Sequence, residues 1–317
     1  MTALTHYPQG FQGFLDAPRV ADLDRLEADI AVLGIPHGVP YRDNTYTYAA
    51  SSIGMARAVR RETTYNPGYL KHWDFDLGGP LFGGRDVRLV DCGDVPHDPT
   101  DVAGSSRLAT AAARKIVDSG ALPIMIGGDD SVPIPFFRAF ADKGPITLVQ
   151  VDSHIDWRHE VGGITEGYSS TMRRASEMPW FMRMVQIGQR GVGSAREAEV
   201  KDALAHGVRF VGARDVHAKG AAWVVDQVPG DRFLVTIDCD GLDPSVIPAV
   251  NAPNPGGLSF HQTVDILHGL ARKGRIVGFD IVELAPHRDP DGMSAMTVAR
   301  IVLNMIGAVA RNGQLGR

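Results

Sequence analysis

Residues 146–157 read Ile-Thr-Leu-Val-Gln-Val-Asp-Ser-His-Ile-Asp-Trp, an apolar β-branched run that leads directly into a polar cluster. A short run of this kind is typical of a buried β-strand. Asp152, His154 and Asp156 follow it at every second position. Alternate side chains of an extended chain point to the same side, so these three converge. Carboxylates and an imidazole at a strand end predict a site for Mn²⁺, Ni²⁺, Zn²⁺ or Fe²⁺ rather than for Ca²⁺ or Mg²⁺ alone.

Seven more apolar runs of similar length occur along the chain, and helical periodicity marks most of the segments between them. In 102–118 and 294–311, apolar residues recur at every third or fourth position, which is typical of an amphipathic helix. Apolar strands that alternate with such helices predict a mostly parallel sheet covered on both faces. The eight expected strands are 29–36, 86–91, 122–126, 146–152, 184–188, 208–211, 233–238 and 276–284.

Length and composition favour a single α/β domain over residues 1–317. Of the 317 residues, 44% are hydrophobic and 22% are charged, which is ordinary for a globular protein. The Gly- and Pro-rich patches at 66–84 and 247–257 interrupt the pattern as long loops. Long loops inside a compact α/β domain are often functional, so we expect them near the site rather than at a domain boundary.

Charge and hydropathy exclude several classes of partner. The net charge is −5 and Lys and Arg are scattered, which argues against nucleic acid. The chain begins without a basic segment followed by an apolar core, and no run of about 18 apolar residues occurs, so we expect neither a signal peptide nor a membrane span. Cys92 and Cys239 lie in strand-like runs, which predicts buried reduced thiols and a cytoplasmic protein.

A second acidic cluster follows the strand expected at 233–238. Asp238 and Asp240 share one face there, and Asp243-Pro244 has the pattern of a turn that braces the loop. Two neighbouring carboxylates in a half-buried place repel each other unless a cation lies between them. Together with the first cluster they supply five ligands, which is enough for a two-metal centre.

Two more acidic positions follow strands. In Gly127-Gly-Asp129-Asp130-Ser131, the glycines allow a sharp turn or a close approach to a ligand. Asp130 or Ser131 could cap the next helix, or Asp129 could cap while Asp130 faces the metals. Glu283 ends the last strand and is either a surface residue or a carboxylate that binds a guanidinium group in a bidentate pair.

These four clusters, in this order, resemble the ureohydrolase family of arginase, agmatinase and guanidinobutyrase. The family motifs are Gly-Gly-Asp-His-Ser, Asp-Ala-His-x-Asp, Ser-x-Asp-x-Asp-x-x-Asp-Pro and Glu-x-x-Pro, and they correspond to residues 127–131, 152–156, 236–244 and 283–286. The resemblance extends from about residue 30 to the C-terminus. It implies a three-layer α/β/α fold, trimers or hexamers, and two divalent ions, Mn²⁺ or in some relatives Ni²⁺.

The resemblance also implies a role for each ligand. His154 and Asp240 would bind the second metal and Asp156 the first, where Asp156 would also stabilise the tetrahedral intermediate. Glu283 would meet the guanidinium group of a small cationic substrate. The reaction implied is hydrolysis of a guanidino C–N bond to urea, or a urea-like product, and an amine. The two bridging carboxylates would be Asp152 and Asp238.

The chain departs from the family at two chemically important positions. Asp130 occupies the place of the histidine that binds the first metal, where a carboxylate could ligate or could leave the metal unbound. The histidine thought to shuttle protons corresponds to Glu166 or to Tyr168, depending on the direction of counting. Glu166 or His159 could take over the proton transfer, although His159 also has the pattern of a solvated loop residue.

Two family segments near the expected pocket mouth are replaced by 41–48 and 247–257. These changes resemble a divergent agmatinase-like branch with guanidinopropionase-like enzymes and nickel-dependent metformin (biguanide) hydrolases, which pair an active subunit with a ligand-depleted one. Two hypotheses follow, a hydrolase of a guanidino or biguanide compound and an inactive subunit that assembles with an active paralogue. Nearby aromatic residues could stack on a cationic substrate or simply pack the loops: Tyr41, Tyr46, Tyr48, Trp157 and Tyr168.

Overall fold

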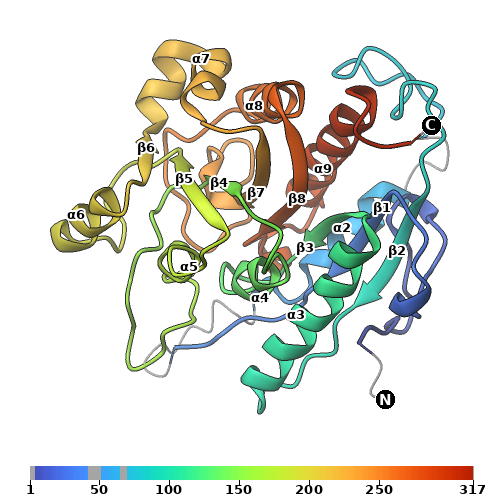
Figure 1. Ribbon diagram of the computed structural model, residues 1–317, viewed down its shortest axis with the longest axis horizontal. Helices are drawn as coiled ribbons and strands as arrows, with labels where there is room; N and C mark the ends of the chain where they lie inside the picture. Colours follow the sequence, from blue (N-terminus) through green and yellow to red (C-terminus); the bar gives the residue numbers. More distant parts are fainter. Residues whose placement is uncertain (1–3, 42–50, 65–69, 317) are drawn as a thin grey trace.

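A computed structural model describes residues 4–41, 51–64 and 70–316, which form an eight-stranded sheet covered by helices (Figure 1). The strand order is β2-β1-β3-β8-β7-β4-β5-β6, and every paired neighbour is parallel. The strands are β1 (Ile30–Gly34), β2 (Leu89–Asp94), β3 (Leu122–Ile126), β4 (Ile146–Val151), β5 (Phe181–Ile187), β6 (Arg209–Val211), β7 (Arg232–Asp238) and β8 (Arg275–Val282).

Two apolar cores lie on opposite faces of this sheet. In β1, Ile30 and Val32 belong to one core, whereas Ala31 and Leu33 belong to the other. A strand that is buried on both faces has an almost continuous apolar sequence, and this pattern is the one that predicted the strands. The covering helices are α2 (Met55–Thr64), α3 (Val102–Ser119), α4 (Pro133–Arg138), α5 (Thr171–Ala175), α6 (Glu197–Ala205), α7 (Ala213–Gln227), α8 (Phe260–Lys273) and α9 (Met293–Arg311).

The predicted α/β sandwich with an eight-stranded parallel sheet is confirmed. Each expected strand overlaps an observed one, and the run at 122–126 has the observed bounds of β3. The largest shift is in β2, which begins at Leu89 rather than at Asp86 and continues to Asp94. Local capping explains the helix predicted at 102–118. The Asp101 carboxylate accepts a hydrogen bond from the Gly104 amide, and Gly120 ends α3 in the left-handed conformation.

One helix among the described residues, α9, is long and apolar enough to cross a membrane by length and composition. In its most apolar window, 78% of the helix is buried inside the fold. It packs against α8 and α2, and Val298, Ile301 and Met305 are fully buried in one of the two cores. The core of the fold therefore accounts for the apolar character of α9.

The order of the strands places the acidic clusters next to one another. The clusters follow β3, β8, β7 and β4, which are four consecutive strands of the sheet. Because the strands are parallel, their carboxyl ends meet at one edge, where ligands bind in open α/β sheets. A row of polar side chains also crosses the sheet one residue pair below this edge. In register on β5, β4, β7 and β8, its members are Gln186, Gln150, Thr236 and Asp280.

Candidate metal centre

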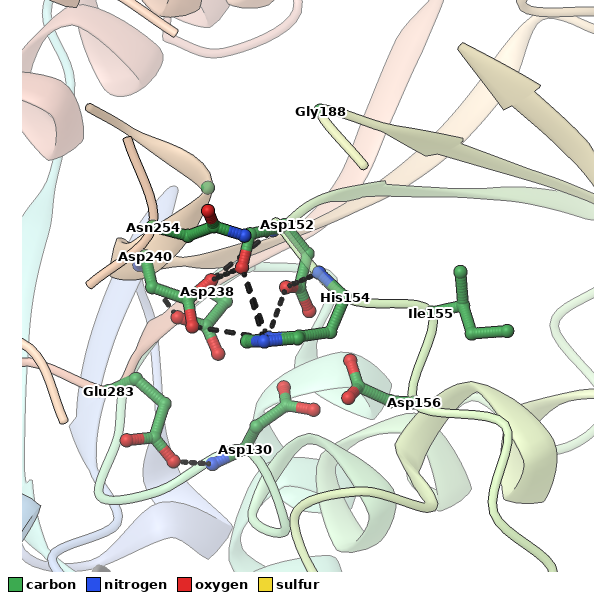
Figure 2. Close-up of polar contacts among 12 residues, drawn as sticks. Asp130, Asp152, His154, Ile155, Asp156, Gly188, Asp238, Asp240, Asn254 and Glu283 are labelled. Atoms are coloured by element: carbon green, nitrogen blue, oxygen red, sulfur yellow. Dashed lines mark hydrogen bonds and ion pairs between the residues drawn. The ribbon is translucent and has the colours of Figure 1, made fainter. Parts of the chain in front are cut away.

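The acidic side chains predicted from sequence converge at the carboxyl edge of the sheet (Figure 2). Ligand atoms of Asp152, His154 and Asp240 lie within 4.8 Å of one another, and so do those of Asp130, Asp152 and Asp156. Asp152 is common to both groups, as expected for a carboxylate that bridges two ions. The residues present therefore fit two adjacent divalent cations.

The group around His154 is held by short contacts. His154 Nδ1 lies 3.2 Å from Asp240 Oδ2 and 3.5 Å from Asp152 Oδ1. The Ser153 hydroxyl donates to Asp240 Oδ1 at 2.9 Å. Asp238 supports the turn after β7, because its Oδ1 accepts from the Asp240 amide at 2.8 Å. These contacts hold Asp240, in the turn after β7, against the imidazole.

The group around Asp130 is organised differently. Asp130 is buried, and neither of its carboxylate oxygens has a hydrogen-bond partner among the residues described. Figure 2 shows its carboxylate pointing toward that of Asp156. Gln150 donates from Nε2 to Asp152 Oδ2 at 2.7 Å and to Asp156 Oδ2 at 2.9 Å. A buried carboxylate without a partner is costly, and a cation at this position would compensate it.

Burial and mutual repulsion disfavour negative charge at several of these carboxyl groups. Burial, reinforced by neighbouring carboxylates, raises the pKa values of Asp130, Asp152 and Asp238 well above the usual range. For Asp240, burial acts in the same direction, but the hydrogen bond from His154 holds its pKa below the usual value. Burial opposes charge on His154 as well, yet Asp240 raises the imidazole pKa to about 9. Without metal ions, protons must therefore supply part of the positive charge.

Glu283 faces the same space from the end of β8. Its Oε1 accepts from the Asp130 amide at 2.9 Å, and its Oε2 accepts from Asn251 Nδ2 at 3.2 Å. Burial, followed by repulsion from Asp129, raises the pKa of Glu283 to about 8. Glu283 and Asp156 both have positive φ, 69° and 42°. Such backbone conformations are unfavourable for residues with side chains and recur at functional sites.

A cavity of about 170 Å³ opens above the acidic groups. Val250 and Ala252 supply apolar lining from the loop 247–257, which was expected at the pocket mouth, and Tyr168 presents an aromatic ring. Asp152 lies beneath the lining and is fully buried. The polar residues that line the cavity are Asp130, His154, Asp156, Ser169, Ser194, Asp238, Asp240, Asn251 and Glu283.

The structure does not bring Glu166 to this cavity. Its carboxylate forms an ion pair with Arg138, with Nη1 and Oε2 3.1 Å apart. Tyr168, the alternative for the same family position, lines the cavity. His159 is exposed and contacts Arg174. The proton-transfer role considered for Glu166 or His159 therefore lacks a geometric basis among the contacts described.

The other aromatic residues have separate positions. Tyr41 packs behind Tyr168, with ring centroids 4.6 Å apart, and its hydroxyl accepts from the Ser169 amide. Trp157 is buried away from the cavity lining and donates to Asp202 at 2.8 Å. For these two, packing is the role that the contacts support. Tyr46 and Tyr48 lie outside the described residues.

Two turn assignments are resolved by hydrogen bonds. The N-cap of α4 is Val132, without a side-chain cap, so the capping role considered for Asp129, Asp130 or Ser131 is wrong. Asp129 instead accepts from the Ser131 amide at 2.9 Å. The brace predicted at Asp243 is confirmed, because its carboxylate accepts from the amides of Ser245, Gly256 and Gly257.

Two residues of the site were missed from sequence. Gln150 precedes Asp152 by two positions and therefore shares its face of β4, a signal that was present but was not used. Asn251 was named only as part of a replaced loop, and its contact with Glu283 spans 32 residues of sequence. Long-range contacts of this kind leave no local pattern.

Comparison with known proteins now places the chain. A sequence model described as the arginase family matches residues 28–307. The chain belongs to the arginase family. Membership indicates a metal-dependent hydrolase of guanidino C–N bonds, and the two convergent ligand groups supply donors for the metal ions.

This arginase-family chain has relatives with several activities. It is similar to the mitochondrial agmatinase of Gallus gallus, with 34% identity over 94% of this chain and 86% of the relative. It is also similar to the guanidinobutyrase of Pseudomonas aeruginosa, with 29% identity over 90% and 87%. Among solved structures, the proclavaminate amidino hydrolase from Streptomyces clavuligerus superposes with a TM-score of 0.82 at 26% identity, over 95% of this chain and 97% of that one.

Proposed function

We propose that this protein hydrolyses a C–N bond of a small cationic guanidino or biguanide compound, using two divalent metal ions, Mn²⁺ or Ni²⁺. The observation that carries the proposal is the convergence of two ligand groups on Asp152 beneath a cavity that also contains Glu283. Two cations at these positions would provide a water nucleophile near neutral pH and stabilise negative charge in the transition state.

The residues of the chain would divide the remaining work. His154 and Asp240 would hold one ion, and Asp130 and Asp156 would hold the other. Asp152, which belongs to both ligand groups, and Asp238, which lines the same cavity, would supply carboxylates to both. Glu283 is held by the Asp130 amide and by Asn251 with its carboxylate exposed to the cavity, where it can accept hydrogen bonds from a guanidinium group.

The lining of the cavity supports a cationic substrate. Five of the described residues that line it, including Glu283, are acidic, and Tyr168 adds an aromatic face for a cation. No Arg or Lys occurs among the described residues that line it. Its volume of about 170 Å³ favours a small compound.

One observation favours a second candidate, a catalytically weak subunit that works with an active paralogue. Among the described residues lining the cavity, His154 is the one histidine, and it belongs to a ligand group. Glu166 is paired with Arg138 instead of facing the cavity. Proton transfer to the leaving amine would then need a group from elsewhere.

A single experiment separates the two candidates. The metal content of the purified protein is measured together with release of urea and amine from guanidine, agmatine, guanidinopropionate, guanidinobutyrate and metformin, with and without a co-expressed homologous subunit. The hydrolase predicts close to two ions per chain and turnover of one compound by the chain alone. Fewer than one ion per chain and no release alone would defeat the hydrolase, and turnover restored by the homologue would support the subunit role. Asp152→Asn is the matched inactive control.

We also propose that the protein forms trimers or hexamers, either of one chain or together with a paralogous subunit, in a reducing cytoplasm. Trp73 and Phe75, two positions apart in sequence, are both exposed, which supports self-association because exposed apolar side chains that gather in a patch mark interaction surfaces. The free, buried thiols of Cys92 and Cys239 suit a reducing compartment. Light scattering during gel filtration tests the assembly, and a monomer at micromolar concentration would contradict it.

A further inference from the structure

The two metal positions differ in the atoms that they offer. The group of Asp152, His154 and Asp240 includes an imidazole nitrogen. The group of Asp130, Asp152 and Asp156 consists of carboxylates, so it offers oxygen atoms alone. We call these the imidazole position and the oxygen position. Nearby Asp238 adds a further carboxylate to the shared cavity.

The surroundings of Asp130 indicate that the fold orients its carboxylate as a metal ligand at the oxygen position. Asp130 is 2% exposed, and neither of its carboxylate oxygens has a hydrogen-bond partner among the described residues. Its amide donates to Glu283 Oε1, and its carbonyl accepts from the Thr171 hydroxyl. The backbone is thus fixed on both sides while the carboxylate is left free, and Figure 2 shows that carboxylate directed toward Asp156.

Gln150 supports the same position from below. Its amide nitrogen donates to one oxygen of Asp152 and one of Asp156, at 2.7 and 2.9 Å. The Gln150 side-chain carbonyl accepts from Gln186, which leaves the nitrogen facing the carboxylates. The second oxygen of Asp152, Oδ1, accepts from the His154 amide at 2.6 Å and faces the imidazole position. The oxygen position is therefore built from three buried, oriented carboxylates.

We propose that the two positions select different ions, a hard cation such as Mn²⁺ or Mg²⁺ at the oxygen position and a borderline cation such as Ni²⁺ or Zn²⁺ at the imidazole position. Carboxylate oxygen suits Mg²⁺ and Mn²⁺, whereas imidazole suits Ni²⁺ and Zn²⁺. This inference rests on the two-metal centre of the proposed function and specifies its composition.

Charge supports the same assignment. The carboxylates of Asp130, Asp152, Asp156, Asp238 and Asp240 surround the two positions. Three of them, those of Asp130, Asp152 and Asp156, gather at the oxygen position, whereas the imidazole position has two carboxylates and one imidazole. An oxygen-rich, anionic environment favours a cation that binds mainly through charge, which Mn²⁺ and Mg²⁺ do more than Ni²⁺.

The test is competitive loading of the intact protein. Metal-free protein is dialysed against a series of solutions in which free Mn²⁺ is in increasing excess over free Ni²⁺, because Ni²⁺ generally binds a given site more tightly than Mn²⁺ does. Elemental analysis gives the number of each ion per chain. Anomalous diffraction at the Mn and Ni absorption edges then assigns each ion to a position. We expect one Mn²⁺ beside Asp130 and one Ni²⁺ beside His154. Two identical ions, or both ions mixed equally over both positions, would overturn the proposal.

Variants separate ligand type from charge. Asp130→His is expected to lower the Mn-to-Ni ratio at the oxygen position by at least about tenfold, the size of effect that altered metal surroundings commonly produce. Asp130→Asn keeps an oxygen donor and should retain the preference for Mn²⁺ over Ni²⁺ with weaker binding. An unchanged ratio in Asp130→His would contradict the inference. If a variant misfolds, as judged by circular dichroism, the wild-type diffraction result decides alone.

The outcomes for the two proposals are distinguishable. A protein that binds one Mn²⁺ and one Ni²⁺ but hydrolyses none of the guanidino compounds would refute the proposed function and leave the ion selection intact. A protein that hydrolyses one of them with two identical ions after competitive loading would do the reverse.

Discussion

The side chain of Asp130 is expected to destabilise the folded protein when no metal ion is bound. The carboxylate is buried beside Asp152 and Asp156 and has no partner among the described residues. Burial and these neighbours both raise its pKa. In the metal-free protein this group therefore opposes folding, whereas with metal bound it becomes a ligand.

Asp130→Asn is accordingly expected to stabilise the metal-free protein. Removing a buried charge without removing the side-chain volume should raise the free energy of unfolding by about 1–3 kcal/mol. Urea denaturation in EDTA at pH 8 measures this. The control is Asp243→Asn, which removes an exposed carboxylate that braces a turn and should destabilise. Destabilisation by both variants would show that Asp130 has a favourable partner.

Glu283 and His154 predict the pH dependence of the metal-free protein. Both have folded-state pKa values above the ordinary ones, about 8 for Glu283 and about 9 for His154. The folded state then binds more protons than the unfolded state, so stability is lost as pH rises through these values. Burial lowers the pKa of His37 to about 3, so His37 changes the stability only below pH 6.5, the ordinary pKa of histidine.

The free energy of unfolding in EDTA should therefore fall between pH 6.5 and about pH 9. Glu283→Gln should reduce the slope, because one of the titrating groups is gone. Saturating Mn²⁺ should reduce it as well, since cations replace the protons. Urea titrations at several pH values provide the measurement, and a rising stability over this interval would be inconsistent with raised pKa values.

For individual residues, the sequence predicted which side chains could bind metal, but it did not predict which side chains contact each other. The sequence predicted Asp152, His154 and Asp156 as ligands, and each belongs to one of the two ligand groups. The strand alternation assumed for them does not hold, because β4 ends at Val151 and Asp156 has a positive φ. The direction of Glu166 was not predictable, because its partner Arg138 lies 28 residues away on α4. No local spacing encodes that ion pair.

Among the elements, β4 connects the polar row to the metal centre through Gln150. We expect Gln150→Met to weaken metal binding at the oxygen position by about 10–100-fold, because Asp152 and Asp156 lose the donor that orients them. Calorimetric titration with Mn²⁺ measures the affinity. Thr236→Val is the matched control in the same row, since Thr236 contacts Asp280 and no ligand. Equal effects of the two substitutions would argue against a role specific to Gln150.

Helix α2 is attached to β2 by a buried ion network. Arg60 is 1% exposed and contacts Asp91 and Asp94, with Nε and Asp91 Oδ2 2.8 Å apart. Arg60→Met should lower the free energy of unfolding by about 3–5 kcal/mol, because Asp91 is left buried without its counter-ion. Arg61→Met, on the exposed face of the same helix, should change it by less than about 1 kcal/mol. Similar urea midpoints for the two variants would contradict this.

For the whole molecule, metal binding and folding should be coupled. Because ligands come from β3, β4 and β7, unfolding disperses them and the ions bind the folded state alone. At a metal concentration of about 100 times Kd, each ion should stabilise by about 2.7 kcal/mol. Thermal unfolding with and without Mn²⁺ tests this, with Asp152→Asn as the control that loses the shift. An unchanged Tm in the wild type would show that the carboxylates do not bind the ion.

The sequence predicted the strands of the sheet better than it predicted the loops around the site. Eight apolar runs became eight strands because both faces of the sheet are buried, which leaves a strong signal in each run. The segment 247–257 has no such periodicity, and its arrangement depends on Arg190, which donates to carbonyls of Asp240, Leu242 and Asn254. Contacts of one side chain with several distant carbonyls are a property of the assembled fold.

The polar row of Gln186, Gln150, Thr236 and Asp280 has a consequence for how the strands find their partners. These side chains lie in register on four strands, between apolar residues that face the opposite core. If β4 slid by one residue, Gln150 would move to that apolar face and its amide would lose Asp152, Asp156 and Gln186. Misaligned pairings are thus penalised in the middle of the sheet, so correct alignment can be selected during folding before any ion arrives.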